Sequence, residues 1–401
     1  MDNEPHLFET LIIFGTLEMT VSELLRLIPP ETFRELAVET KVDAEVKKLS
    51  GEVMFKLILF SMLNSERLSL RVMETFLQSA RFKSFSHYDI LDSRYNSIRD
   101  RICSINAEYF EKLFEKVFSI YNRQLKEEHA LSKTDSTYVA LAAKLFSEGI
   151  KNGVDQSKRF VKYSVNLKGS LPSMIKIFTD QSHVNESVAL SELINDCNCL
   201  KDNIVVFDRG LRSRRAFDRF TDDYKYFVSR GDVNVRCKAV ASTKVPKRPE
   251  GSSLKIFRDE TGWLISKKEK KTQHHYRLIK GTLDSSGETI SFITNMLDED
   301  CYLIAHWYRQ RWEIESFFKF IKQHLNFKHL VSRDENGIKV MLYMTMITAT
   351  LILAYKKINS LKGYKITKLK FEIELENEVI KAIVTLCGGN PAKAPHFFSS
   401  A

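Results

Sequence analysis

The chain has 401 residues, of which 43% are hydrophobic and 28% charged, with only 15 glycines and 8 prolines. This composition supplies enough apolar side chains for a packed core, and it excludes a disordered, collagen-like or low-complexity protein. The charge is basic, with 61 Lys and Arg against 51 Asp and Glu and a formal net charge of +10. Such an excess favours polyanionic partners, either nucleic acid or an anionic membrane surface.

Residues 1–128 are predicted to form a helical N-terminal domain. Apolar residues recur at helical spacing over 21–28, where two prolines follow, and again over 53–63, 69–79 and 106–125. Several short helices could form a helix-turn-helix that binds DNA ends, or they could form a purely structural bundle. Periodicity alone does not separate these two possibilities.

The pattern changes after residue 128 to alternating strands and helices. Residues with strand spacing cover 132–141, 160–167, 174–179, 203–208 and 226–229, and helical spacing covers 188–194 and 212–220. This order predicts a mixed α/β sheet with helices on its faces over residues 129–230. Residues 231–296 are strand-like and rich in turns, which predicts a β-rich antiparallel insertion, and a long helix is expected from Asp300 to about Phe327.

The positive charge is concentrated in one stretch. Residues 209–280 hold 20 Lys and Arg against 8 Asp and Glu, whereas the remaining residues hold 41 against 43. Aromatic residues are interleaved with these cations, as in surfaces that bind a phosphate backbone and stack on bases. A solvated basic surface is the plainer alternative, but the concentration favours a face that binds nucleic acid.

One apolar run tests the alternative of a membrane protein. Residues 340–355 contain no charge, but the run has sixteen residues with three threonines, whereas a bilayer span needs about 20 apolar residues. A buried core helix explains the run better. The N-terminal residues 1–9 are acidic where a signal peptide would be basic, so a cytoplasmic protein with reduced thiols is expected.

Three acids are candidates for a catalytic site. Asp135 lies within the first predicted strand, Asp208 ends an apolar strand, and Glu315 lies in the long predicted helix. A carboxylate at the end of a buried strand must be hydrogen-bonded, paired with a cation or bound to a metal. For each acid alone, a turn cap or a surface ion pair is a sufficient explanation.

The predicted helix carries one polar face. At 100° per residue, an acid, three cations and a phenol fall within about 80° of one another: Tyr308, Arg311, Glu315, Lys319 and Lys322. The opposite side is apolar and is predicted to dock on the sheet: Leu303, Ile314, Phe317 and Ile321. A ladder of ion pairs accounts for the charges on this helix but not for Tyr308 or for the strand acids.

The spacing of Tyr308, Arg311, Glu315 and Lys322 resembles the Tyr-Arg-Glu-Lys signature of DDE transposases in the insertion sequence 4 family. Further blocks match in the same order: Asp135-Ser-Thr, Asp208-Arg-Gly, Tyr226-Phe-Val-Ser-Arg230, Tyr276-Arg-Leu-Ile and Thr294-Asn295. The resemblance covers residues 131–330, which is half of the chain.

The resemblance implies a fold in which a ribonuclease-H-like catalytic core, residues 129–230 and 297–360, is interrupted by the basic β-rich insertion, residues 231–296. The helical N-terminal domain precedes this core, and the C-terminal tail, residues 361–401, has no assigned role. Within the core, Asp135, Asp208 and Glu315 become the ligands of two Mg²⁺ ions, for which Mn²⁺ can substitute. Carboxylates suit these cations because Mg²⁺ prefers hard oxygen ligands.

The resemblance also implies a set of DNA-binding residues. Tyr308, Arg311 and Lys322 match positions that contact the transposon end, and Lys319 joins them because it lies on the same helix face. Arg209 and Arg230 lie in the matching blocks, and Trp263 is a candidate to stack on a displaced base.

The function implied is that of a transposase that cuts the ends of a transposon in double-stranded DNA and transfers the freed 3′-OH to target DNA. Cutting two ends together suggests a dimer on DNA, in the bacterial cytoplasm at the nucleoid and not at a membrane. Two alternatives stay open, a metal-dependent DNA nuclease without strand transfer and a non-catalytic DNA-binding protein derived from a transposase. A further alternative, a basic protein that binds the membrane surface, is supported only by the net charge and by the apolar run 340–355.

Overall fold

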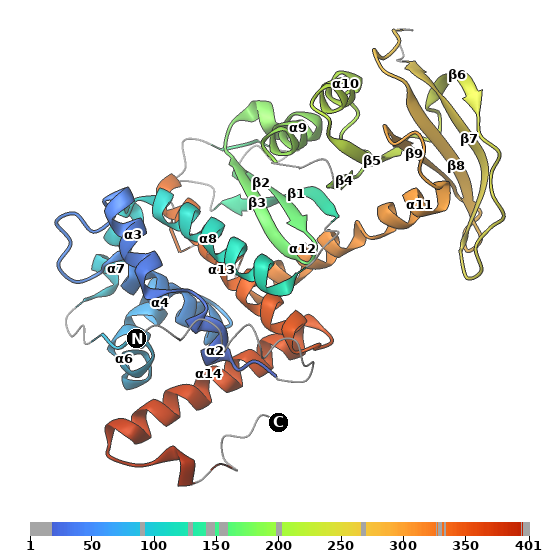
Figure 1. Cartoon of the computed structure of the whole chain (residues 1–401). Helices are drawn as coiled ribbons and strands as arrows, with labels where there is room; N and C mark the ends of the chain where they lie inside the picture. The colour runs from blue at the N-terminus through green and yellow to red at the C-terminus, as the bar shows by residue number, and fades with distance from the viewer. Residues whose placement is uncertain are drawn as a thin grey trace, which may run out of the picture. The chain divides into compact units, whose positions relative to one another are not determined.

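The chain folds into two compact units (Figure 1). The helical unit comprises Met1–Lys126 and Phe320–Ala401, and the α/β unit comprises Glu127–Lys319. The computed structural model describes residues 18–88, 93–126, 131–141, 149–151, 159–197, 203–265, 270–325, 327, 331–332, 334–393 and 395.

Several helices of the helical unit begin at side-chain caps. Ser50 and Ser69 each accept a hydrogen bond from the backbone N–H three residues on, at 3.3 and 3.2 Å, as preferred N-cap residues do. The helices of the N-terminal part are α2 (Val21–Arg26), α3 (Pro30–Thr40), α4 (Gly51–Leu63), α5 (Leu70–Gln78), α6 (Ala80–Ser86), α7 (Tyr95–Ser104) and α8 (Ala107–Leu125). The C-terminal part adds the end of α12 (Trp312–His324), then α13 (Glu335–Ile358), α14 (Tyr364–Leu386) and a short 3₁₀ turn, Pro391–Lys393.

Helix α13 forms the centre of the helical unit. It contacts α2, α4, α7, α8 and α14. The hydroxyls of its threonines donate hydrogen bonds to backbone carbonyls one turn earlier in the helix, as Thr345 does to Met341 O at 2.8 Å. By length and composition α13 could cross a bilayer, but 94% of its most apolar window is buried inside the protein. This burial agrees with the prediction of a core helix.

The packing of α13 changes the predicted domain boundary. Residues 297–360 were expected to belong to the catalytic core, but the contacts group Phe320 and everything after it with the N-terminal helices. Likewise, α14 lies within this unit, and its Phe371 and Leu375 are buried, so residues 361–386 are not a separate tail. An apolar run shows that a helix is buried, and it does not show which neighbours bury it.

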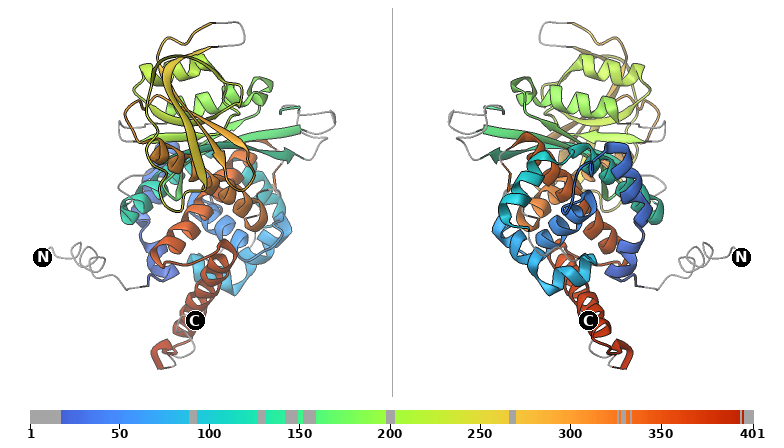
Figure 2. Two further views of the ribbon diagram at one scale, coloured as in Figure 1. Left: turned by 90° about the vertical axis from the view of Figure 1, so that its right-hand side faces the viewer. Right: turned by 90° about the vertical axis from the view of Figure 1, so that its left-hand side faces the viewer.

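The α/β unit is organised around one nine-stranded sheet in the order β3-β2-β1-β4-β5-β9-β8-β7-β6 (Figures 1 and 2). The strands are β1 (Ser132–Leu141), β2 (Arg159–Lys168), β3 (Leu171–Phe178), β4 (Ile204–Phe207), β5 (Tyr226–Gly231), β6 (Arg236–Ser242), β7 (Leu254–Ile265), β8 (Tyr276–Leu283) and β9 (Thr289–Thr294). Strands β1, β4 and β5 run parallel, and every other neighbouring pair is antiparallel. A mixed α/β sheet was predicted and is confirmed.

Successive side chains of a central strand point to opposite faces of the sheet, so apolar residues of the same strand contribute to a core on each face. Val205 and Phe207 of β4 pack with α9 (Glu186–Asp196) and α10 (Arg214–Asp222). Between them, Val206 points to the opposite face and packs with α11 (Cys301–Arg309). Figure 1 shows α9 and α10 on one side of β4 and β5 and α11 on the other.

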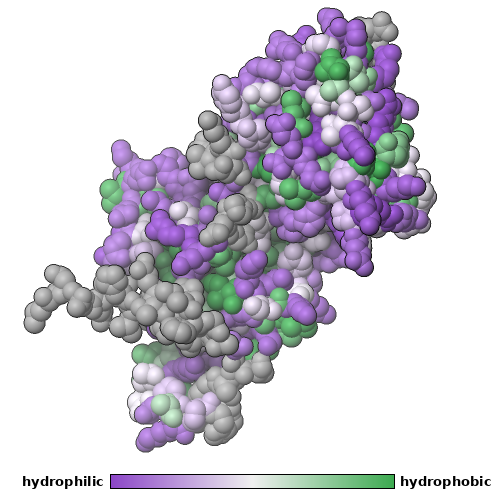
Figure 3. All heavy atoms as spheres, turned by 45° about the vertical axis from the view of Figure 1, so that its right-hand side comes forward, coloured by the Kyte–Doolittle hydropathy of each residue, from purple (hydrophilic) through white to green (hydrophobic). Residues whose placement is uncertain are grey.

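The predicted insertion, residues 231–296, continues the same sheet and does not form a separate body. Strand β9 pairs with β5, and β8, β7 and β6 follow outward. Inside it, Arg277 and Asp259 form a buried bidentate pair, with N–O distances of 2.8 and 2.6 Å. Strand β6 and its neighbouring turn are largely exposed, and the face in Figure 3 is mostly hydrophilic with scattered apolar side chains.

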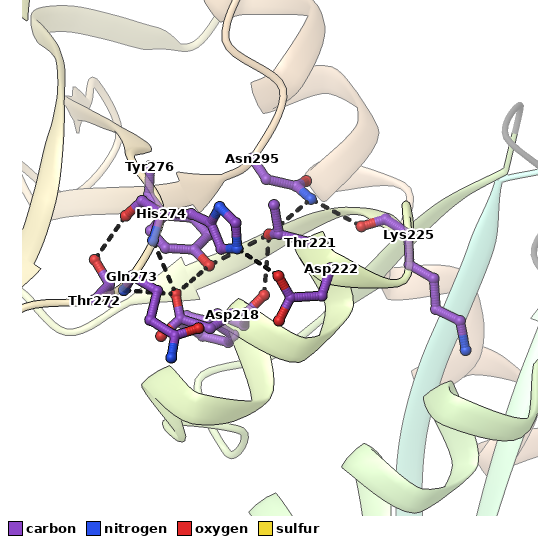
Figure 4. A network of polar contacts seen from close by, with 10 residues as sticks. Asp218, Thr221, Asp222, Lys225, Thr272, Gln273, His274, Tyr276 and Asn295 are labelled. Atoms are coloured by element: carbon purple, nitrogen blue, oxygen red, sulfur yellow. Dashed lines mark hydrogen bonds and ion pairs between the residues drawn. The ribbon is translucent and has the colours of Figure 1, made fainter.

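A polar network ties α10 to the inner strands of the insertion (Figure 4). Asp218 accepts hydrogen bonds from the hydroxyl of Tyr276 at 2.9 Å and from the backbone N–H of Gln273 at 3.1 Å. Asn295 donates to the carbonyl of Lys225 at 2.8 Å and accepts from the backbone of Phe227 at 3.0 Å. These bonds fix the start of β5 against the end of β9.

The long helix predicted from Asp300 to Phe327 is wrong as a single element. It is two helices, α11 and α12, separated at Gln310 and Arg311. The backbone N–H of Arg311 binds Tyr308 O at 3.0 Å, and that of Ile314 binds Arg311 O at 3.1 Å, so the chain tightens into three-residue turns there. The predicted helix face therefore breaks at Arg311, and Leu303, expected to dock on the sheet, is exposed.

Candidate active site

The parallel pairing of β1 and β4 places two of the predicted acids side by side. Thr134 pairs with Phe207 in the register of these strands, so the next residues along, Asp135 and Asp208, lie on neighbouring strands and on the same face. Each carboxylate is held locally. Asp135 accepts from the N–H of Ser136 at 2.8 Å, and Asp208 accepts from the N–H of Gly210 at 2.7 Å.

Arg311 connects Asp135 to the third predicted acid, Glu315. Its guanidinium lies 3.5 Å from Asp135 Oδ2 and donates a second hydrogen bond to Glu315, four residues on. The Arg311 side chain is only 10% exposed, so these charges interact in a poorly solvated place. The structure thus brings Asp135, Asp208, Arg311 and Glu315 to one region of the α/β unit.

Tyr308 forms the apolar wall beside this cluster. Its ring packs on Phe292 with a centroid separation of 5.2 Å, and the Arg311 guanidinium lies over it at 5.7 Å. Burial raises the pKa of Tyr308, although the charges of Arg311 and Arg230 act in the opposite direction. The phenol was predicted on an exposed polar face, and the structure buries it because α11 docks on β9 and β5.

The pKa of Asp135 is strongly perturbed. Burial raises it to about 7, and the negative charge of Asp208 adds to the rise, while the N–H of Ser136 and the charge of Arg311 lower it. When both neighbouring carboxylates ionise, their negative charges therefore repel each other, and Arg311 offsets this through its contact with Asp135. This is the electrostatic environment that a cation would stabilise.

A further glutamate lies beside Asp208, and no pattern in the sequence pointed to it. Glu186 begins α9 and forms an ion pair with Lys162 of β2 at 2.7 Å, and the Lys162 side chain is fully buried. A Cβ built on Gly210 would lie 2.6 Å from Glu186 Cγ and 2.8 Å from Asp208 Oδ1. The Asp208-Arg-Gly turn therefore requires glycine at this position, because any side chain would displace one of the two acids.

A second ion pair joins β1 to α12. The ammonium of Lys133 lies 2.7 Å from Glu313 Oε2 and 2.6 Å from Gly169 O. Both residues lie two positions before a predicted acid, since Lys133 precedes Asp135 and Glu313 precedes Glu315. That proximity was the signal available in the sequence, but neither residue belongs to the Tyr-Arg-Glu-Lys pattern.

The remaining predicted residues lie at varying places in the fold. Lys319 is exposed and Lys322 half-buried on α12, and Arg209 is exposed directly after Asp208. Arg230 pairs with Glu288 and acts electrostatically on Tyr308. Trp263 stays within the insertion, where it packs edge-on against His275 with centroids 4.3 Å apart.

Comparison with known proteins finds a family whose match includes part of this cluster. Residues 152–351 match the family described as "Transposase DDE domain". This stretch, just under half of the chain, is similar to a transposase DDE domain. The matched residues include Asp208, Arg311 and Glu315, whereas Asp135 lies upstream of them. The prediction of a DDE transposase is confirmed at this level, and the insertion sequence 4 family and its signature stay predictions.

The transposase domain is similar to those of insertion sequences. A Geobacillus stearothermophilus protein, named as the probable transposase of insertion sequence element IS5377, is 26% identical over 286 residues, which is 68% of this chain and 71% of that protein. A Synechocystis protein, named for a transposase of element IS4SA, is 29% identical over 224 residues, which is 55% of this chain and 58% of that protein. A transposase chain in the structure of a piggyBac synaptic complex with hairpin DNA aligns with 91% of this chain and over 82% of its own length, at 11% identity and a TM-score of 0.48. This likeness is too slight to establish a shared fold.

The transposase DDE domain implies a dependence on a divalent metal, typically Mg²⁺. Asp135 and Asp208 fit this requirement, because they offer neighbouring carboxylate oxygens in a poorly solvated place where the charge of one disfavours ionisation of the other. Glu315 is engaged by Arg311 instead. Among the residues that the structure describes, no three His, Cys, Asp or Glu side chains gather closely enough to hold a metal ion.

Proposed function

We propose that this protein is a transposase of the insertion sequence 4 type that cuts transposon ends and joins the resulting 3′-OH to target DNA. The observation that supports the proposal most is that Arg311 pairs with both Asp135 and Glu315 while Asp208 lies close enough to raise the pKa of Asp135, in a chain that matches a transposase DDE domain over residues 152–351. The substrate is double-stranded DNA, both as the two ends of the element and as the target.

The topology supports a ribonuclease-H-like core. Strands β3, β2 and β1 form an antiparallel meander, and β4 and β5 then add parallel to β1 through α9 and α10. The first acid lies on β1 and the second directly after β4. A helix on the opposite face from α9 and α10 leads to the third acid. The insertion enters after β5 and leaves the parallel strands intact.

The three carboxylates would hold two divalent ions. When bound, such ions stabilise the charge that develops on the attacking and leaving oxygens of a phosphodiester. The protein's own contribution is to fix the acids, and it does so through the N–H groups of Ser136 and Gly210 and through the packed wall around Tyr308. A rigid, poorly solvated site strengthens these electrostatic effects.

Arg311 is proposed to leave its carboxylate partners, Asp135 and Glu315, and to bind a phosphate of the DNA backbone instead. Its Nε is buried and has no hydrogen-bond partner among the residues that the structure describes. A guanidinium presents several donors in a fixed plane and binds phosphate well. Turning toward the DNA backbone would satisfy Nε and free Glu315. Lys319, Lys322, Arg209 and Arg230 would provide additional contacts to phosphates.

Replacing one acid tests this function. Glu315→Gln keeps the size of the side chain but removes its charge, so DNA binding should persist while strand cleavage falls by at least about a hundredfold. The measurement is cleavage of a DNA duplex that carries the ends of the element, in Mg²⁺ and in Mn²⁺, beside a gel-shift assay of binding. The exposed Glu299→Gln serves as the control and should cleave normally. Cleavage retained by Glu315→Gln would exclude Glu315 from the site.

Strand transfer separates the proposal from its alternatives. With the 3′ end of the element labelled, a transposase moves the label into a target plasmid, and a simple nuclease releases it without joining. A non-catalytic DNA-binding protein would show neither nicking nor transfer. In keeping with the substrate, we propose that the protein acts in the bacterial cytoplasm at the nucleoid, as a dimer that holds both ends.

A further inference from the structure

We propose that Glu313 and Lys133 are positioning residues that fix α12 against β1, so that Glu315 is presented to Asp135. This inference rests on the proposed function, because it concerns how the three acids come together. Neither residue belongs to the matched signature, and neither is proposed to touch metal or DNA.

The burial of Lys133 is the first observation. Its side chain is 3% exposed, and a buried ammonium is stable only when its donors are satisfied. Its two acceptors come from separate elements, Gly169 O in the turn between β2 and β3 and Glu313 at the start of α12. Lys133 thus connects the sheet to the helix from a buried position, whereas the Glu313 carboxylate that it binds is 53% exposed.

The second observation is that α12 is attached to β1 at two points. Lys133 and Asp135 lie on the same face of β1, two residues apart. Lys133 contacts Glu313, and Asp135 contacts Arg311. The chain from 311 to 313 therefore runs antiparallel to β1 at this point. One contact would leave the helix free to rotate about it, whereas two contacts fix both its rotation and its shift along the strand.

The third observation concerns what happens when Arg311 releases the acids. Because Arg311 holds Glu315 and Asp135, its departure toward DNA would remove one of the two attachments. The Lys133–Glu313 pair would then be the remaining ionic contact that these residues provide between β1 and α12. Its role is to keep Glu315 beside Asp135 in the state that binds metal.

The test combines two variants with two readouts in the full-length protein. Glu313→Ala leaves the buried Lys133 ammonium with only a carbonyl partner, so both the unfolding midpoint and the affinity for Mn²⁺ should fall. The double variant Lys133→Met and Glu313→Ala removes both charges, so its unfolding midpoint should recover. Its Mn²⁺ affinity, measured without DNA by electron paramagnetic resonance, should stay about 10- to 100-fold below wild type.

A matched control is Glu192→Ala, which breaks an ion pair of 2.9 Å between Lys176 of β3 and α9 in the same unit. It should leave Mn²⁺ affinity unchanged. High Mn²⁺ should restore DNA cleavage in Glu313→Ala but not in Glu315→Gln, because only the second variant lacks a ligand.

Recovery of both stability and Mn²⁺ affinity in the double variant would show that the pair is only structural and would overturn the inference. So would wild-type Mn²⁺ affinity in Glu313→Ala, or an equal loss in Glu192→Ala. Failure of the proposed function would look different, since wild-type protein would then neither cleave DNA nor depend on Glu315.

Discussion

At the scale of single residues, the site depends on an imbalance of charge. Asp135 lies on β1 and Asp208 directly after the neighbouring strand β4, Arg311 pairs with Asp135, and burial raises the pKa of Asp135 to about 7. In the proposed mechanism, Arg311 therefore has two functions in turn. It stabilises the acids while no other cation is present, and it is available to a phosphate when metal replaces it.

The raised pKa of Asp135 predicts how stability depends on pH without metal. Between about pH 4 and pH 7 the unfolded carboxyl loses its proton while the folded one keeps it, so the free energy of unfolding should fall as pH rises through this window. Asp135→Asn should flatten this fall, and the exposed Asp298→Asn should not. Urea unfolding at several pH values in a chelator measures it. A wild-type profile that rises from pH 5 to pH 7 and is unchanged by Asp135→Asn would contradict this assignment.

The three proposed acids and Arg311 were recognisable from the sequence, because they combine a rare pattern with a place in an element. Their pairing partners were not recognisable. Lys133 and Glu186 look like ordinary charged residues, and only the sheet register and the docking of α9 and α12 show that each lies next to an acid. Such contacts join residues far apart in the chain, and periodicity carries no information about them.

At the scale of elements, the observed bounds of the strands and helices predicted between residues 132 and 229 agree with the predicted ranges to within a few residues. The failures have clear causes. The turn at Gln310 and Arg311 contains no glycine or proline, so helical spacing continued through it. The apolar run of α13 predicted burial correctly, but its neighbours are the N-terminal helices.

The buried pair of Arg277 and Asp259 anchors the insertion to the start of α11. Arg277 also donates to the carbonyls of Leu297 and Glu299 in the loop before that helix. Asp259→Ala would leave a buried guanidinium unpaired, so we expect a loss of about 3–5 kcal/mol in the free energy of unfolding of this unit. Asp284→Ala, which breaks the more exposed pair with Arg248, should cost far less, because solvent screens an exposed ion pair. Equal losses from chemical denaturation would contradict this role of the buried pair.

At the scale of the whole molecule, the excess positive charge is concentrated in the stretch that directly follows Asp208. The stretch 209–280 carries the excess, and much of it lies on exposed parts of the insertion, at Arg236, Lys238, Lys244, Lys247, Lys255 and Arg258. Charge on an extended surface binds a DNA backbone without reading its sequence.

This distribution predicts the salt dependence of DNA binding. Replacing Lys238, Lys244 and Lys255 together by alanine should weaken binding alike for all sequences and reduce the slope of log affinity against log salt by about one for each phosphate that is no longer neutralised. Lys47→Ala with Lys48→Ala, which removes exposed charges from the helical unit, should leave the slope unchanged. Fluorescence anisotropy over a range of salt concentrations gives the slopes. An unchanged slope in the triple variant would show that the insertion does not hold DNA.

Three carboxylates, from β1, the end of β4 and α12, are proposed to form one metal-binding site over DNA. A crystal structure of the protein with cleaved element-end DNA and Mn²⁺, phased to locate manganese by its anomalous signal, tests this directly. We predict manganese bound by Asp135, Asp208 and Glu315, with Arg311 turned away from Glu315 and onto a phosphate. Manganese bound elsewhere in a crystal whose DNA has been cut, with Arg311 still paired to Glu315, would contradict the proposal.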